Sequence, residues 1–242
     1  MGFQASEREF QQRFWIIGGI IWAGFLAYFF DHVNAADALT RLILRTHDES
    51  SATFGHVITA LFALGTLIVA IGALIRSWAE SYLHSSIVHD AALHGEQLVA
   101  DGPYRRVRNP LYLGNLFLAI GLGFLASRVG FFIISIGMLI IVYRLILREE
   151  TTLLHSQGEG YRRYFAAVPR LWPALTPRVP AAGAKPNWLD GFTGELFMWG
   201  GAGGMLAFTL TRNILYFWIV FGAGMLIYFL QSWLRARRKT AA

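Results

Sequence analysis

The chain has 242 residues, of which 55% are hydrophobic and 15% are charged, and its formal net charge is +6. A soluble domain of this length normally carries more charge, so the composition favours a membrane protein. The chain contains no cysteine, which excludes disulfides, thiolate nucleophiles and cysteine metal sites. In a membrane protein the positive charge indicates loops that face anionic lipid, so we expect a membrane partner and no nucleic acid.

Six apolar segments follow one another along the chain, and each predicts a membrane helix. The runs from His56 to Ile75 and from Asn213 to Leu234 contain no charged residue. We expect the first segment to be a retained helix rather than a signal peptide, because the charges that precede it cancel. The predicted helices cover about residues 14–30, 55–76, 111–127, 129–147, 192–211 and 213–234.

Positive residues concentrate in the segments 77–110 and 148–191 and in the C-terminal tail. The positive-inside rule therefore predicts a multi-pass protein with both long loops and both termini in the cytoplasm. Residues 78–98 and 151–168 mix apolar and polar side chains and predict interfacial helices, although 78–98 also fits a loop. The predicted fold class is all-α: a polytopic transmembrane helical bundle of about six helices, with a tight hairpin of the third and fourth helices and cytoplasmic interfacial helices.

A Pro/Gly/Ala-rich stretch from Pro173 to Pro186 predicts a linker. It divides the chain into a membrane core at 1–172, a linker at 173–191, and an added C-terminal helical pair with a basic tail at 192–242. The glycine-rich run at 200–204 lies inside an apolar helix with no strand before it. It predicts close helix packing rather than a nucleotide-binding loop.

Several kinds of catalytic site are not supported. The seven histidines include no pair at the four-residue spacing that places two ligands on one helix face. The chain also lacks the Gly-x-Ser-x-Gly elbow of serine hydrolases. We therefore expect no metal and no serine nucleophile.

Polar side chains instead gather where the third predicted helix begins and the fourth ends. Gly102-Pro103 predicts a turn, and Pro110 suits the first turn of a helix. The hairpin should return the end of the fourth helix to the level of the start of the third. Anchoring of the helices to lipid head groups is the alternative interpretation. The residues brought together in this way are Tyr104, Arg108, Asn109, Tyr112, Arg144, Arg148, Glu149 and Glu150.

The amino-acid sequence of this region resembles that of a known family. Residues 102–114 read Gly-Pro-Tyr-Arg-x-Val-Arg-Asn-Pro-x-Tyr-x-Gly, and Glu149-Glu150 and then Gly158-x-x-Tyr-x-x-Tyr-x-x-x-Val-Pro follow. Over roughly residues 55–172, the chain resembles the isoprenylcysteine carboxyl methyltransferase family and the related phospholipid N-methyltransferases.

The resemblance implies S-adenosylmethionine as methyl donor and a lipid or prenylated small molecule as acceptor. The donor-binding residues that it implies are Leu98, Tyr104, Arg108, Asn109, Pro110, Tyr112, Gly114 and Glu150. The catalytic residues that we expect are Arg144, Arg148, Glu149 and Glu150.

The resemblance indicates the identity of the methyl acceptor less directly than that of the donor. Isoprenylcysteine enzymes usually have His where this chain has Asn109, and Asn cannot carry a proton near neutral pH. A carboxylate acceptor is already ionised at pH 7 and needs an arginine, so Arg144 and Arg148 favour methylation of an isoprenylcysteine-type carboxylate. An amine acceptor must lose a proton, so a phospholipid (ethanolamine) N-methyltransferase would use Glu149 or Glu150 as base.

Two further interpretations come from other classes. One is a membrane reductase of the sterol-reductase type, which shares this kind of helical core and uses a nicotinamide cofactor. The other is a non-enzymatic membrane scaffold, against which the intact Glu149-Glu150 pair argues.

Overall fold

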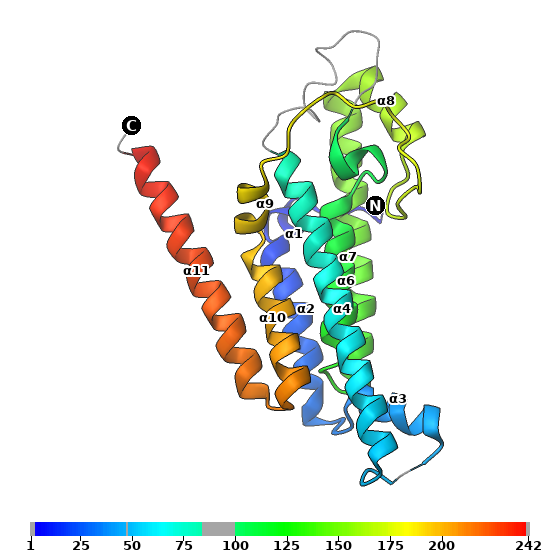
Figure 1. Ribbon diagram of the computed structural model, residues 1–242. Helices are drawn as coiled ribbons and strands as arrows, with labels where there is room; N and C mark the ends of the chain where they lie inside the picture. Colours follow the sequence, from blue (N-terminus) through cyan, green and yellow to red (C-terminus); the bar gives the residue numbers. More distant parts are fainter. Residues whose placement is uncertain (1–2, 47, 84–99, 241–242) are drawn as a thin grey trace.

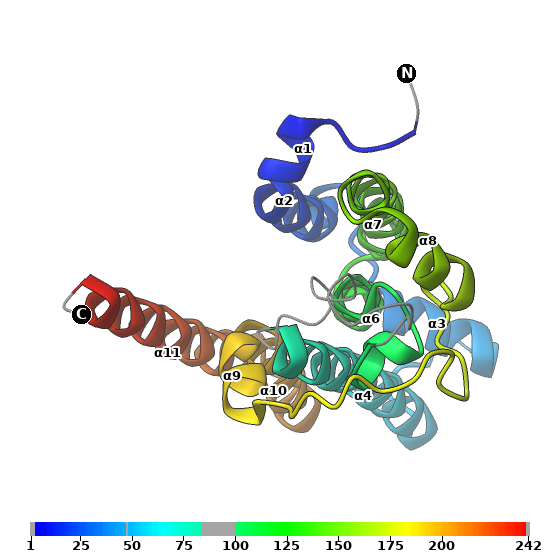
Figure 2. The same cartoon turned by 90° about the horizontal axis from the view of Figure 1, so that it is seen from above.

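The computed structural model describes residues 3–46, 48–83 and 100–240. These residues form an elongated bundle of α-helices, seen from the side in Figure 1 and from above in Figure 2. The described ranges contain no β-strand, so the predicted all-α fold class is confirmed. The elements are α1 (Glu7–Gln11), α2 (Arg13–Leu26), η1 (Ala27–Phe29), α3 (Ala35–Leu44), α4 (Ala52–Leu83), η2 (Gly102–Arg105), α6 (Pro110–Gly123), α7 (Arg128–Ser156), α8 (Gly158–Ala167), α9 (Trp188–Gly194), α10 (Leu196–Thr211) and α11 (Ile214–Thr240).

Three helices are long and apolar enough to cross a membrane: Ala52–Tyr82, Arg128–Ser156 and Ile214–Leu234. Three shorter apolar segments accompany them, namely Arg13–Phe29, Pro110–Gly123 and Leu196–Thr211. These six correspond to the six predicted membrane helices. Both termini lie at the same end of the bundle as α8, as an even number of crossings requires (Figure 1). The side of the membrane on which that end lies stays a prediction.

The short helix α6 occupies the middle of the bundle, between α4 and α7 (Figure 2). Its 14 residues rise only about 21 Å, less than the ~30 Å of a hydrocarbon core, but its neighbours shield its ends from lipid. The helix ends at Gly123, four residues earlier than predicted, because the amides of Leu125 and Ala126 bond back to Leu122 and Gly123 in a tight turn. Ser127 then caps α7 by accepting a hydrogen bond from the Gly130 amide at 3.1 Å. The predicted tight hairpin is confirmed.

Helices α4 and α6 cross at two pairs of glycines. A Cβ added at Gly114 would lie 2.9 Å from the Gly72 carbonyl oxygen and 2.8 Å from the Cδ of Arg76. One step further along the crossing, a Cβ at Gly65 would lie 3.1 Å from the Gly121 carbonyl oxygen. The seven-residue spacing on both helices keeps these glycines on the contact faces, where only a residue without a side chain allows the backbones to approach.

Helix α7 is longer than expected and continues to Ser156. The expected end near residue 147 was wrong, because Thr151 and Thr152 stay in the helix and bond to the carbonyls of Leu147 and Arg148. A separate helix, α8, starts at Gly158, whose φ of +63° breaks α7. The glutamate pair therefore lies inside α7 and not at its end. The predicted interfacial segment 151–168 is divided between the two helices, while most of 78–98 lies outside the described residues.

The C-terminal helices pack against α4 and against each other. Helices α9 and α10 contact α4, and α11 packs along α10. The predicted close packing at the glycine-rich run is confirmed, since a Cβ at Gly204 would lie 3.0 Å from the Phe217 carbonyl oxygen. Helices α9 to α11 therefore form a second wall beside the α4–α6–α7 core.

Candidate functional site

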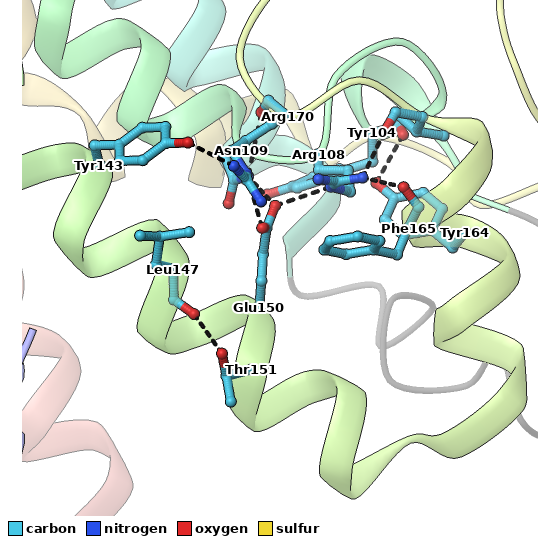
Figure 3. A network of polar contacts seen from close by, with 11 residues as sticks. Tyr104, Arg108, Asn109, Tyr143, Leu147, Glu150, Thr151, Tyr164, Phe165 and Arg170 are labelled. Carbon is cyan, nitrogen blue, oxygen red and sulfur yellow. Dashed lines mark hydrogen bonds and ion pairs between the residues drawn. The ribbon is translucent and has the colours of Figure 1, made fainter. Parts of the chain in front are cut away.

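Glu150 is the centre of a buried polar network between α7 and the start of α6 (Figure 3). Its side chain is only 2% exposed. One carboxylate oxygen accepts from Arg108 Nε at 2.9 Å and from Asn109 Nδ2 at 3.1 Å, and the other accepts from Arg170 Nε at 2.9 Å. The predicted return of Asn109 and Glu150 to the same level is thus confirmed. Two charge-assisted hydrogen bonds and one from an amide thus hold the Glu150 side chain in place.

Arg108 extends the network to the end of α8. Its Nη1 donates to the Val168 carbonyl at 2.9 Å and also to the Phe165 carbonyl, and its guanidinium lies 3.9 Å from the centre of the Phe165 ring. The Arg108 side chain is 6% exposed. Its donors close the last turn of α8, where the helix carbonyls have no partners of their own.

Two buried tyrosines join η2 to α8. The Tyr164 hydroxyl donates to the Tyr104 carbonyl at 2.8 Å. Burial raises the pKa of Tyr104, Tyr161 and Tyr164 above the ordinary value for tyrosine, so all three phenols are neutral at pH 7. Gly102 begins η2 with a φ of +54°, a conformation that glycine adopts without strain. The predicted turn at Gly102-Pro103 is confirmed.

A second polar group lies on the other side of η2, around Arg76 of α4. Its guanidinium binds both carboxylate oxygens of Glu195, at 2.6 and 2.8 Å, and Glu195 is 3% exposed. Its remaining nitrogen donates to the Leu111 carbonyl at 3.1 Å and to Asn115 Oδ1 at 3.0 Å. Arg76 therefore joins α4, α6 and the start of α10 at one point.

The Tyr104 side chain packs with Ala79 of α4 and with Tyr161 and Tyr164 of α8. The residue is 6% exposed, and its hydroxyl has no hydrogen-bond partner among the described residues. The phenol lies within electrostatic range of Glu80, Glu149, Arg76 and Glu195. An unpaired buried hydroxyl normally costs stability.

Glu149 faces a different environment from its neighbour Glu150. It accepts a hydrogen bond from the Tyr112 hydroxyl and forms no ion pair within the described ranges. Tyr112 and Glu149 therefore lie at the same level, as the hairpin predicted. The two glutamates differ in environment, because Glu150 accepts three hydrogen bonds from protein donors while Glu149 retains more of its acceptor capacity.

The two arginines that were predicted to be catalytic are not brought to this network. Arg144 binds both oxygens of Glu9, at 2.9 and 2.8 Å, and Arg148 binds Glu7 and the Ala5 carbonyl. Both guanidinium groups thus hold the N-terminal segment on α7. This placement removes the geometric support for their attraction of an anionic acceptor.

The remaining predicted residues have packing roles or lie outside the description. Pro110 occupies the first turn of α6, and Gly114 allows Arg76 to cross α6. Leu98 lies outside the described residues. In the part of the chain that the structure describes, no group of three or more His, Asp or Glu could hold a metal ion.

Sequence reasoning missed three site residues. Arg170 directly follows Val168-Pro169, so the end of the quoted motif was the available signal. Glu195 is the last acidic residue of the chain and begins an apolar helix, a position where a lone charge marks a function or a partner. Arg76 is likewise a charged residue at one end of a long apolar run, here in the last turns of α4. The partners themselves are distant in sequence and follow only from the fold.

An apolar helical bundle with a buried polar network near one end is an α-helical integral membrane protein with an internal polar site. Residues 60–158 match the profile of the family described as phospholipid methyltransferase, which contains integral membrane methyltransferases. The predicted resemblance to this group of enzymes is thereby confirmed for that segment, which includes η2, Asn109 and both glutamates.

Two curated relatives are similar over part of their length. The chain is 27% identical over 134 residues to the cobalt-zinc-cadmium resistance protein CzcN of Cupriavidus metallidurans. The aligned region covers 52% of this chain and 59% of that protein. The chain is also 26% identical over 117 residues to the nickel-cobalt-cadmium resistance protein NccN of Alcaligenes xylosoxydans xylosoxydans. This aligned region covers 48% of this chain and 52% of that protein. The chain thus spans about half the length of the curated relatives it matches. No solved structure matches it significantly.

Proposed function

We propose that the chain is an S-adenosylmethionine-dependent methyltransferase that acts on a lipid-borne acceptor at the η2 end of the bundle. The observation that carries this proposal is the buried Tyr104 hydroxyl, which has no hydrogen-bond partner among the described residues and lies within electrostatic range of Glu149, inside the segment that matches the phospholipid methyltransferase family. The half-buried Glu149 carboxylate and the Tyr104 hydroxyl suit a ligand that brings hydrogen-bond donors and positive charge.

The residues present fit such a methyl donor. Its ammonium and ribose hydroxyls are donors, and Glu149 and the Tyr104 hydroxyl have the capacity to accept from them. When bound, the donor supplies an electrophilic methyl group on a sulfonium. Glu150, Arg108 and Asn109 already satisfy one another, so their task is to fix the turn between η2 and α6.

The protein's contribution to methyl transfer is alignment and exclusion of water. Tyr104 and Glu150 are buried, and the aromatic residues of α8 cover η2 from one side. A rigid network of this kind holds the reacting groups in line without further movement. No step in this mechanism needs a nucleophilic side chain.

Between the two acceptors, the geometry favours an amine. An amine loses a proton before or during transfer, and the Glu149 carboxylate is placed to accept it. Arg144 and Arg148 would be needed for a carboxylate acceptor, but they are paired with Glu9 and Glu7. We therefore propose amine N-methylation on a phospholipid, as the family description suggests.

Methylation of an isoprenylcysteine-type carboxylate is the second candidate. It is favoured by the position of Arg148 next to Glu149 on α7, with a side chain that is 26% exposed. In this case the N-terminal segment would have to release Arg148 to the acceptor.

Ligand titration of the purified protein in detergent tests the proposal. We expect binding of S-adenosylmethionine and none of NADPH, with binding weakened at least tenfold in Glu149→Gln and unchanged in Glu159→Gln, an exposed position on α8. Wild-type protein that binds NADPH and not S-adenosylmethionine would establish the reductase interpretation instead. Radiolabel transfer to phosphatidylethanolamine or to a farnesyl-cysteine analogue then identifies the acceptor, since base-labile label marks a methyl ester.

A further inference from the structure

The loop that follows α8 presents two large apolar side chains to its surroundings. Trp172 is 84% exposed and Leu175 is 95% exposed, the highest values among the large hydrophobic residues described. Outside a membrane this exposure would be costly, at about 25 cal/mol for each Å² of apolar surface. These side chains therefore need a partner.

The exposure does not result from a loose segment, because both ends of the loop are held. Arg170 at its start binds Glu150 at 2.9 Å and the Tyr143 hydroxyl at 2.8 Å. Arg178 near its end donates its amide to the Arg105 carbonyl at 2.8 Å. In the middle, the Ala174 amide donates to the Arg106 carbonyl at 2.9 Å. The loop is thus fixed in a shape that turns Trp172 and Leu175 outward.

The loop continues a surface that faces lipid. Helix α7 carries a stripe of exposed apolar residues at helical spacing, and the stripe ends at Tyr143, the residue that Arg170 binds. The tip of the loop descends beside the bundle to about the level of α9, which also exposes Trp188 and Leu189 (Figure 1). Viewed from above, the loop lies at the periphery (Figure 2). The stripe consists of Val129, Phe132, Ile136, Ile140 and Tyr143.

The charge of this region matches the surface of an anionic bilayer. From residue 160 to residue 189 the chain contains no Asp or Glu. Positive side chains near a membrane are attracted to anionic head groups, while Trp and Tyr prefer the boundary between head groups and hydrocarbon. The positive residues in this range are Arg162, Arg163, Arg170, Arg178 and Lys185.

We propose that residues 171–178 form a membrane-inserted loop, with Trp172 and Leu175 in the interfacial layer of the bilayer and Arg178 at anionic head groups. The partner is the lipid surface itself. Because Arg170 at the start of the loop binds Glu150, contact with lipid is connected to the network that fixes the η2–α6 turn. This inference does not depend on the reaction that the site performs.

Site-directed spin labelling tests the proposal, and the chain is suited to it because it contains no cysteine. Trp172→Cys and Leu175→Cys would each carry a nitroxide in vesicles of phosphatidylcholine with a minority of phosphatidylglycerol. Ile136→Cys on the α7 stripe is the lipid-exposed reference, and Glu159→Cys on α8 is the water-exposed reference. The measured quantity is the ratio of collision rates with oxygen, which concentrates in lipid, and with a water-soluble nickel chelate.

We expect ratios at positions 172 and 175 that are severalfold above the ratio at position 159 and approach that at 136. A ratio equal to that of position 159 at both sites would overturn the proposal. Protection from both reagents, with a short label-to-label distance between two copies, would also overturn it, since a second chain would then cover the loop. Independently, brominated phosphatidylcholine should quench wild-type fluorescence more than that of Trp172→Phe, and equal quenching would contradict insertion.

Discussion

The Asn109 side-chain amide donates to the Glu150 carboxylate at 3.1 Å, which joins the residue before α6 to the interior of α7. Glu150 accepts three hydrogen bonds from protein donors, whereas its neighbour Glu149 contacts the Tyr112 hydroxyl. Two adjacent glutamates therefore have separable roles, one in holding the fold of the site and one in the proposed chemistry.

This separation predicts different losses in the two variants. Glu150→Ala leaves the buried guanidinium of Arg108 without its carboxylate and should lower the free energy of unfolding by about 3–5 kcal/mol. Glu149→Gln keeps the size and the hydrogen bond, so it should retain near wild-type stability while methyl transfer is lost. Thermal unfolding in detergent and radiolabel transfer measure the two effects. Equal destabilisation by both variants would contradict the assignment.

The unpartnered hydroxyl of Tyr104 makes a second prediction. Tyr104→Phe removes a buried polar group that has no partner among the described residues, so its melting temperature should equal or exceed that of the wild type. Binding of S-adenosylmethionine should weaken by about tenfold, or about 1.4 kcal/mol, the size expected for one hydrogen bond. Tyr164→Phe is the matched control, because its hydroxyl bonds to the Tyr104 carbonyl and its loss should reduce stability. A Tyr104→Phe variant that melts lower but binds the donor normally would show a purely structural tyrosine.

The ion pair between Arg76 and Glu195 predicts that α10 contributes to the stability of the core. Glu195→Ala should lower the free energy of unfolding by about 3 kcal/mol, because Arg76 loses both bonds to a buried carboxylate. The exposed pair of Glu159 and Arg162 serves as control, since Glu159→Ala should change stability by about 0.5 kcal/mol or less. Unfolding curves of the two variants side by side distinguish a buried from a surface pair.

The crossing of α4 and α6 predicts that Gly114 tolerates no side chain. Gly114→Ala places a methyl group against Arg76 and the Gly72 carbonyl and should destabilise the protein by about 1–3 kcal/mol. Gly55→Ala on α4 has open space around it and should stabilise its helix by about 0.5–1 kcal/mol. Melting temperatures that shift in the same direction for both variants would argue against a close helix crossing at Gly114.

The pH dependence of stability should depend in part on Asp31, at the opposite end of the bundle. The hydrogen bonds from Arg128 and from the Val129 amide lower the pKa of Asp31 from 3.8 to about 2. Its contribution is therefore complete above about pH 4 and is lost as the pH falls toward 2. The difference in melting temperature between wild type and Asp31→Asn should shrink over this window.

Asp37 provides a comparison of opposite sign. Burial raises the pKa of Asp37, so its ionised form opposes folding at neutral pH. Asp37→Asn should accordingly be at least as stable as the wild type at pH 7, with an advantage that disappears as the pH falls. Identical pH profiles for the Asp31 and Asp37 variants would refute both assignments.

The sequence predicted the parts of this molecule that depend on local pattern. The apolar runs predicted six membrane helices, Pro110 indicated where α6 begins, and the hairpin brought Asn109 to Glu150. The predicted end of α7 was wrong, because a charged residue such as Glu149 is typical of a helix end. The sequence does not show that such a residue has partners inside the bundle. The pairing of Arg144 with Glu9 was also out of reach, since it joins segments 135 residues apart and no local pattern encodes it.

The distance along the chain between Arg76 and Glu195 bears on how the protein is made. The two residues are 119 positions apart, and at ribosomal speeds of ~5–20 residues per second the wait between them is on the order of ten seconds. During that time α4 has left the ribosome with a guanidinium near its end that lacks its carboxylate. A nascent chain that stops before α10 would retain an Arg76 guanidinium that has no carboxylate partner near the end of α4. The last helical pair would then act as a late checkpoint of assembly.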